Sequence, residues 1–359
     1  MQKRAKKSTC PGNARVLVTG AGGPATENAV QSLKLCECEV VGVDVNEDML
    51  RLSGADYKYK VHHASEATEF YIRELNEYYR KHECSMLLPI TDREVFVAAV
   101  NQYRLPKLPL PHWKLIAHCR EKDGLYKFMD AHGFEIPETV YQLEGYKLTK
   151  PMWIRASLGA GGYLAAAVYT QEELDGYFQF YKNKHKPFMS EYLQGRNYCW
   201  TALYVKGKLE LSVSKQRLGW VYNRIGTSAV QRTVHDQKIT DLCTGVVNKL
   251  VEEFDPEMTG LMMVDLMEDW PRGSLYVTEV NAGRTGTVSI WFSLASRHIF
   301  GDDRVNFHYQ LLRAHLGLPL IPHEHVDSLP EDIGFTRHID MGALLSYKEQ
   351  EWKFSPWGG

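Results

Sequence analysis

Residues 260–284 read GLMMVDLMEDWPRGSLYVTEVNAGR, and this stretch decides the fold. LMMVDLM is short and apolar, and SLYVTEV is rich in β-branched and aromatic residues, so both segments are predicted to be buried strands. Pro271 to Gly273, between them, are typical of a turn. The stretch therefore predicts a β-hairpin.

Three oxygen-bearing side chains lie on this hairpin. Glu279 and Asn281 are two residues apart on one strand, so their side chains point to the same face. Asp265 on the other strand can lie opposite them. Two carboxylates and an amide suit Mg²⁺, with Mn²⁺ as an alternative, carrying the phosphates of a nucleotide. An acidic pair at a hairpin end is more often a solvated edge, and the upstream segments decide between these interpretations.

Composition excludes several classes of protein. The chain has 359 residues, 44% hydrophobic and 24% charged, which is typical of a soluble protein of two or three domains. A net charge of −2 provides no drive toward nucleic acid or an anionic membrane. No apolar run approaches the length of a membrane span. The basic residues 1–13 lack an apolar core and are expected to form a flexible leader.

Cysteine usage indicates the redox compartment. The seven cysteines are odd in number and scattered, which argues against a disulfide framework and favours free thiols in a reducing cytoplasm.

The first hundred residues alternate between strands and helices. ARVLVTG, residues 14–20, predicts a buried strand that leads into a glycine-rich turn, a helix and a second strand ending at Asp44. The alternation continues to the proline-rich linker at 104–112 and predicts a parallel sheet with helices on both faces. The turn and Asp44 resemble a dinucleotide site, but Pro24 removes an amide that the pyrophosphate needs. We favour a structural or substrate-facing turn and keep NAD binding as an alternative.

The middle of the chain carries a glycine-rich strand–loop–strand. Residues 152–156 predict a strand with Arg155, and residues 163–169 predict its return strand. Gly159, Gly161 and Gly162 lie in the loop between them, whose bare amides could close over phosphate oxygens. A plain flexible hairpin is the alternative. Short helices are predicted on both sides of Lys122. Further helices are predicted over 171–184, 236–253 and 291–300 and around 305–316, and a loosely patterned tail follows them.

In this order, the segments resemble the ATP-grasp superfamily along residues 14–320, and especially the ATP-binding halves of the carbamoyl-phosphate synthase large subunit and their stand-alone relatives. The most specific motifs are IRASLGAGG (154–162), EYLQG (191–195) and VDLMEDWPRGSLYVTEVNAGR (264–284). The resemblance implies a mixed α/β and α+β fold, with a Rossmann-like domain before a two-lobed ATP-grasp domain built on antiparallel sheets. The implied divisions are 1–13 (leader), 14–112 (Rossmann-like), 113–190 (small lobe with lid), 191–320 (large lobe with metal site) and 321–359 (tail).

The resemblance also implies a role for each candidate residue, with ATP and Mg²⁺ as cofactors. Phosphates are expected to meet Lys122 and Arg155, under a lid formed by Gly159, Gly161 and Gly162. Adenine is expected at Glu191 and the backbone of Leu193. The metal ligands are expected to be Asp265, Glu279 and Asn281, and the catalytic residues Arg284 and Arg155. For each, a surface ion pair or a core polar group is the structural alternative.

The chain departs from the family pattern in three places. Asn197 stands where an acid usually binds the ribose, although an amide can still hydrogen-bond there. Ala156 stands where proline is usual. The usual Asn-Pro-Arg is Asn281-Ala282-Gly283-Arg284, which shifts the arginine by one residue and leaves its contact open.

The resemblance predicts an ATP-dependent ligase that activates a small carboxylic acid, amino-acid or peptide-like, as an acyl phosphate for attack by an amine. Phosphorylation of bicarbonate or carbamate and a non-catalytic nucleotide-binding module are the alternatives. Candidates for the acceptor pocket, each of which can also be structural, are Thr285, Thr287, Ser289, Arg297 and Arg337 to Asp340. The apolar C-terminal half is compatible with a homodimer.

Overall fold

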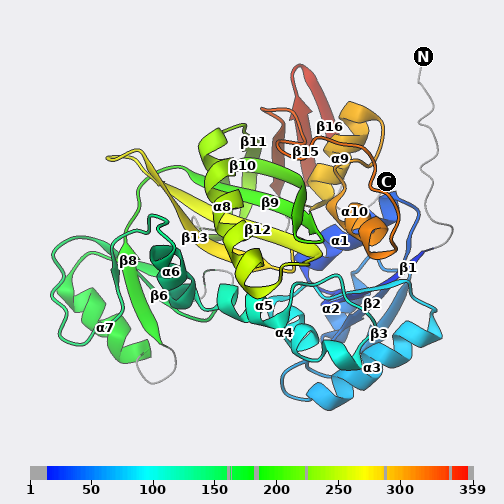
Figure 1. Ribbon diagram of the computed structural model, residues 1–359, viewed down its shortest axis with the longest axis horizontal. Helices are drawn as coiled ribbons and strands as arrows, with labels where there is room; N and C mark the ends of the chain where they lie inside the picture. The colour runs from blue at the N-terminus through cyan, green and yellow to red at the C-terminus, as the bar shows by residue number, and fades with distance from the viewer. Residues whose placement is uncertain are drawn as a thin grey trace.

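The computed structural model describes residues 14–159, 162, 164–181, 186–222, 225–286, 289–338 and 342–354. These residues form three sheets, arranged along the long axis of the molecule with helices between and around them (Figure 1). None of the helices in these ranges is long and apolar enough to cross a membrane. The mixed α/β and α+β fold class predicted from the sequence is confirmed.

The N-terminal sheet is parallel, with strand order β3-β2-β1-β4. Its strands are β1 (Arg15–Thr19), β2 (Glu39–Asp44), β3 (Tyr57–Lys60) and β4 (Met86–Leu88). Its helices are α1 (Pro24–Leu35), α2 (Glu47–Arg51), α3 (Thr68–Lys81) and α4 (Asp92–Val100), followed by the 3-10 turn η1 (Gln102–Arg104). Parallel strands must be joined by crossovers, and α1 and α3 occupy the two longest of them. The expected Rossmann-like alternation is present.

The smallest sheet is antiparallel, in the order β5-β8-β6-β7, and forms the left end of Figure 1. It contains β5 (Thr139–Val140), β6 (Met152–Ala156), β7 (Ala166–Val168) and β8 (Pro187–Glu191). The accompanying helices are α5 (Trp113–Arg120), α6 (Lys122–Ala131) and α7 (Gln171–Tyr181). Met152, Ile154, Val168 and Met189 are fully buried in its small core. The return strand β7 is shorter than predicted.

The largest sheet is antiparallel, in the order β13-β12-β9-β10-β11-β14-β15-β16. Its central strands are β9 (Asn197–Val205), β10 (Lys208–Tyr222), β11 (Ile225–Thr233), β12 (Gly260–Asp269) and β13 (Ser274–Ala282). The last three are β14 (Gly334–His338), β15 (Gly342–Tyr347) and β16 (Gln350–Phe354). They lie in the region expected to be a tail, where the sequence analysis predicted no strands.

The two faces of the large sheet pack against different helices. Trp200, Val264 and Leu266 point toward α8 (Gln237–Phe254) and α5. The opposite face packs against α9 (Ser289–Phe300) and α10 (Phe307–His315), through residues such as Leu211 and Val213. Because strand side chains alternate, Leu261 and Asp265 of β12 lie on this second face.

The hairpin β12–β13 has the predicted register. Asp265 is the Cα partner of Glu279, and Met263 is the partner of Asn281. The register shifts after Asp265, because Leu266 pairs with Val277 and leaves Thr278 as a bulge. Bulges are frequent beside functional sites, where they re-aim side chains. The hairpin prediction is confirmed.

The cysteines of the described ranges are buried and free: Cys36, Cys38, Cys84, Cys119, Cys199 and Cys243. Burial raises the pKa of the Cys84 thiol to about 12 and that of Cys119 still further. These thiols therefore stay protonated and pack as small apolar groups, as the sequence analysis expected.

Candidate functional site

The hairpin brings the three predicted metal ligands together, and each of them contacts a cation. Asp265 Oδ1 lies 2.6 Å from Arg217 Nη2, and Glu279 Oε1 lies 3.6 Å from Lys122 Nζ. Asn281 Oδ1 accepts a hydrogen bond from Arg284 Nη2. The predicted juxtaposition is present, while the metal-binding role of these residues stays a prediction.

Arg217 was not among the residues predicted from the sequence. It lies on β10, which continues to Tyr222, and it points to the face that carries Asp265. Burial acts to lower the pKa of Arg217, but the charge of Asp265 outweighs it and raises the pKa. Arg217 also donates to Asn197 Oδ1 over 3.0 Å. The predicted ribose residue is thereby linked to the predicted metal ligand.

Lys122 is the first residue of α6, whereas the sequence predicted that it lies between two helices. Its ammonium group donates to the carbonyl of Gly159, so it joins the glycine-rich loop to Glu279. A small cavity of about 10 Å³ lies at this junction. Its lining includes Asp92, Arg120, Lys122, Leu158, Gly159, Glu279 and Asn281.

The side chain of Arg155 extends from strand β6 of the small sheet to strand β13 of the large one. Its Nη1 donates to the carbonyl of the bulged Thr278 over 3.0 Å. The guanidinium lies 4.9 Å from the ring centres of both Tyr126 and Phe188, which fixes its plane. Its Nε and Nη2 are buried and have no partner among the described residues. Buried donors without partners are rare, so this arginine has two hydrogen bonds to offer an anionic ligand.

Arg284 lies beside a second pair that the sequence analysis did not select. Asp92, at the start of α4, accepts from Arg120 Nε over 3.0 Å and lies 3.8 Å from Arg284 Nη2. The N-terminal domain therefore contributes a carboxylate to the edge of the site. The site contains five cationic side chains against three anionic ones: Arg120, Lys122, Arg155, Arg217 and Arg284 against Asp92, Asp265 and Glu279.

The predicted adenine residues lie at the end of β8. Glu191 is held by Lys150 at 3.1 Å and by Arg272 at 2.5 Å. Partial burial acts to raise the pKa of Glu191, but hydrogen bonds from Arg272 and Lys150 outweigh it and lower the pKa. Leu193 is buried, and among the described residues no hydrogen bond uses its backbone. An adenine could therefore hydrogen-bond to the backbone of Leu193, but it would have to compete with Lys150 and Arg272 for Glu191.

Asp44 has a structural explanation that weakens the dinucleotide alternative. Its Oδ2 accepts from Gly22 N and its Oδ1 from Asn46 N, each over 2.8 Å. The acid that would bind a ribose in a dinucleotide site thus stabilises the glycine turn and the start of α2.

Of the remaining predicted residues, Thr285 and Ser289 are buried, and Arg337 Nε donates to Ser228 O over 3.2 Å. Gly162 adopts a φ of +74°, which favours glycine, and its carbonyl accepts from Ala165 N over 3.1 Å. Arg297 pairs with Asp303 at 2.6 Å and donates to Leu35 O, so it has the structural role given as its alternative. Gly161, Thr287, Ile339 and Asp340 lie outside the described residues.

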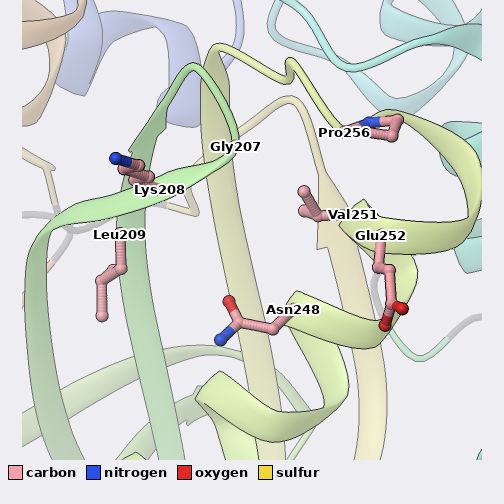
Figure 2. Close-up of a pocket in the computed structure, with 7 residues that line it drawn as sticks. All are labelled: Gly207, Lys208, Leu209, Asn248, Val251, Glu252 and Pro256. Carbon is pink, nitrogen blue, oxygen red and sulfur yellow. The ribbon is translucent and has the colours of Figure 1, made fainter.

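A larger cavity, of about 370 Å³, lies between the β9–β10 turn and the C-terminal half of α8 (Figure 2). Its walls are Gly207, Lys208, Leu209, Asn248, Val251, Glu252 and Pro256. Asn248 Oδ1 accepts from Tyr204 Oη over 2.9 Å, so its amide oxygen is already engaged. We place the functional site at the smaller cavity, because the charged groups converge there.

Comparison with known proteins agrees with this architecture. Residues 119–287 match the ATP-grasp domain family, a range that contains the glycine-rich loop and the hairpin. Residues 119–287 thus carry an ATP-grasp domain. The superfamily resemblance predicted from the motifs is confirmed. No curated protein matches the chain in sequence.

Solved structures share the fold at low identity. An L-amino acid ligase from Bacillus licheniformis has a TM-score of 0.66 at 14% identity, over 94% of this chain and 82% of that one. A second structure is the biotin carboxylase domain of the Hydrogenobacter thermophilus 2-oxoglutarate carboxylase, a dimer in complex with MgADP and bicarbonate. Its TM-score is 0.64 at 15% identity, over 89% of this chain and 73% of that one. A carboxyaminoimidazole ribonucleotide synthase from Aspergillus clavatus, complexed with ATP, has a TM-score of 0.64 at 16% identity, over 93% of this chain and 81% of that one.

Proposed function

We propose that this chain is an ATP-dependent carboxylate–amine ligase. It would phosphorylate a small carboxylic acid, amino-acid or peptide-like, and the acyl phosphate would be attacked by an amine to give an amide or peptide bond, ADP and phosphate. The observation that carries the proposal is the convergence of Lys122, Arg155 and Arg217 on the Asp265–Glu279 hairpin. A surplus of cations around two paired carboxylates suits a triphosphate held with a divalent ion.

The residues present fit Mg²⁺ and a nucleotide. Asp265, Glu279 and Asn281 supply hard oxygen donors on one sheet face, and Arg155 has two buried N–H groups without a protein partner. Bound there, Mg²⁺ would neutralise charge on the phosphates. Lys122 would exchange the Gly159 carbonyl for a phosphate oxygen. Arg217 would leave one Asp265 oxygen free, because it contacts only Oδ1.

The acid substrate is proposed to bind farther along the same sheet face. Lys215, two residues from Arg217 on β10, is fully buried. Gln231 is the Cα partner of Arg217 on β11, is fully buried, and neither of its side-chain polar atoms has a partner among the described residues. A buried amide without partners is costly unless a ligand satisfies it. A carboxylate between Lys215 and Gln231 would do so.

The protein would otherwise act by holding the substrates in position and by excluding water from the site. Arg155 and Lys122 would orient the phosphates, and the loop from Ser157 would keep water from the acyl phosphate. The site uses no side-chain nucleophile. Amine attack then forms the C–N bond, breaks the C–O bond to phosphate, and releases a proton. We also propose a cytoplasmic location, small-molecule partners and a homodimer.

An ADP-release screen over amino acids and small carboxylic acids, repeated with amine co-substrates, tests this function. We expect ADP formation that requires both an acid and an amine and that vanishes in Glu279→Gln. The matched control is Glu268→Gln on the same hairpin, because Glu268 pairs with the exposed Arg196 at 2.7 Å. Amine-independent ADP release would contradict the ligase proposal.

Phosphorylation of bicarbonate or carbamate is the second candidate, because one structural neighbour was solved with bicarbonate bound. Labelled bicarbonate separates the two. Incorporation of label into an acid-labile product, without any other carboxylic acid present, would favour this second function.

A further inference from the structure

Three side chains of metal-binding type converge far from the nucleotide site. Glu210 lies on β10, while His323 and His325 lie in the connection between α10 and β14, where residues 316–333 form no helix or strand. One ligand atom from each lies within 4.8 Å of the others. Among the described residues, no other group of three or more His, Cys, Asp or Glu side chains has this spacing.

The ring of His323 faces a carbonyl oxygen at each nitrogen. Nδ1 lies 2.5 Å from Ile321 O, and Nε2 lies 2.8 Å from Glu210 O. A neutral imidazole carries one N–H, so it can donate to only one of them. Gln310 Nε2 also lies 3.2 Å from Nδ1, so the proton can sit on either ring nitrogen. In the tautomer with the proton on Nδ1, Nε2 carries the lone pair that a cation needs.

This arrangement is typical of histidines that bind metals. Such residues usually donate one ring N–H to a backbone carbonyl, which fixes the tautomer and leaves the other nitrogen for the ion. Gln310 supports the same carbonyl, because its Nε2 donates to Ile321 O over 3.0 Å. His323 is therefore oriented by the chain before any ligand binds.

His325 and Glu210 complete the group. His325 Nδ1 lies 2.9 Å from Glu210 O and 3.5 Å from Glu210 Oε2. Ser212 Oγ donates to the backbone oxygen of His325 over 3.2 Å, which holds this segment against β10. Both imidazoles and the carboxylate thus face one small volume beside the Glu210 backbone.

We propose that Glu210, His323 and His325 bind one Zn²⁺ ion that clips the α10–β14 connection to the large sheet. Two imidazoles and one carboxylate suit zinc, whereas Mg²⁺ prefers ligands that are all oxygen. A water molecule would occupy the fourth position. The clip closes a long connection without secondary structure, so it stabilises the fold near α10 and β14.

Zinc titration of the full chain, made without a histidine tag and stripped with a chelator, tests the site. Excess Mg²⁺ is included to cover the oxygen ligands of the nucleotide site. We expect one Zn²⁺ per chain, a raised melting temperature, and Co²⁺ absorption bands typical of a tetrahedral site. His323→Ala and Glu210→Gln should each weaken binding by at least about tenfold.

His325→Ala guards against variants that fail to fold, because 64% of its side chain is exposed. The matched control is His62→Ala, since His62 pairs with the single carboxylate of Glu74 at 2.6 Å and should not change zinc binding. Zinc affinity that is equal in the wild type, His325→Ala and His62→Ala would overturn the proposal. Loss of zinc in Glu279→Gln instead would assign the ion to the nucleotide site.

Discussion

Arg217 Nη2 lies 2.6 Å from Asp265 Oδ1, although β9 separates the two strands that carry these residues. The pair spans the sheet on the face of the proposed nucleotide site. About a sixth of each side chain is exposed, 14% for Arg217 and 17% for Asp265, so water screens the pair only weakly.

Removal of Arg217 should therefore destabilise the fold. In Arg217→Met, Asp265 stays half-buried without its partner, and we expect a loss of about 3 kcal/mol in the free energy of unfolding. Arg196→Met is the control, because 52% of the Arg196 side chain is exposed in its pair with Glu268, and it should cost about 1 kcal/mol or less. Urea unfolding at neutral pH measures both. Equal losses would show that the Arg217 pair is no more stabilising than a surface pair.

Lys215 predicts a pH dependence opposite in sign to that of a lysine whose pKa is raised by a salt bridge. Burial lowers its pKa from 10.5 to about 8. Between these values the unfolded chain binds more protons than the folded one, so this residue makes stability rise with pH. Below pH 8 the buried charge costs on the order of 3 kcal/mol.

We therefore expect Lys215→Met to be more stable than the wild type at pH 7, with the difference shrinking toward pH 10. The comparison of urea unfolding at several pH values removes the contribution of other groups. If the Lys215 ammonium also binds the acid substrate, as proposed, the same variant should raise the KM for that acid. A difference in stability that does not change with pH would contradict the lowered pKa.

The hairpin and the glycine loop could be predicted because their signals are local. An apolar run, a Pro-Arg-Gly turn and alternating strand residues specify Asp265 opposite Glu279 without knowledge of the rest of the fold. Arg155 was found for the same reason, since it lies in a short buried strand before three glycines.

Arg217 and Asp92 could not be predicted, because their roles depend on tertiary contacts. Arg217 lies on a long strand, and its burial and its contact with Asp265, which distinguish it from a surface arginine, arise only in the folded sheet. Asp92 reaches the site because α4 of the first domain packs beside α5. Strands β14 to β16 were missed because their pairing with β11 is long-range in sequence, and a strand's preference depends strongly on its neighbours.

Arg155 should not tolerate replacement by lysine. Its planar guanidinium lies between Tyr126 and Phe188, donates to Thr278 O, and still has two N–H groups to offer. Lysine cannot form this fork, so Arg155→Lys should lower ATP affinity by about 10-fold to 100-fold. The control Arg73→Lys changes another arginine stacked on a ring, Phe70 at 4.9 Å, away from the site. Calorimetric titration with MgATP measures both, and unchanged affinity in Arg155→Lys would remove it from the phosphate site.

Gly195, the last residue of the EYLQG motif, is expected to be intolerant of any side chain. A Cβ there would lie 2.1 Å from the carbonyl oxygen of Glu268, and this oxygen belongs to the backbone of β12, which cannot move alone. Gly195→Ala must push the adenine segment away from the hairpin and should cost about 1–3 kcal/mol.

Gly176→Ala is the matched control, because a Cβ in α7 meets nothing within 4 Å. Alanine is the better helix former, so this variant should gain up to about 1 kcal/mol. Thermal unfolding of the two variants should therefore shift in opposite directions. The displacement at Gly195 should also weaken ATP binding, since it moves Leu193 and Glu191 relative to Asp265. Loss of stability in Gly195→Ala with unchanged ATP affinity would separate the packing of this segment from nucleotide binding.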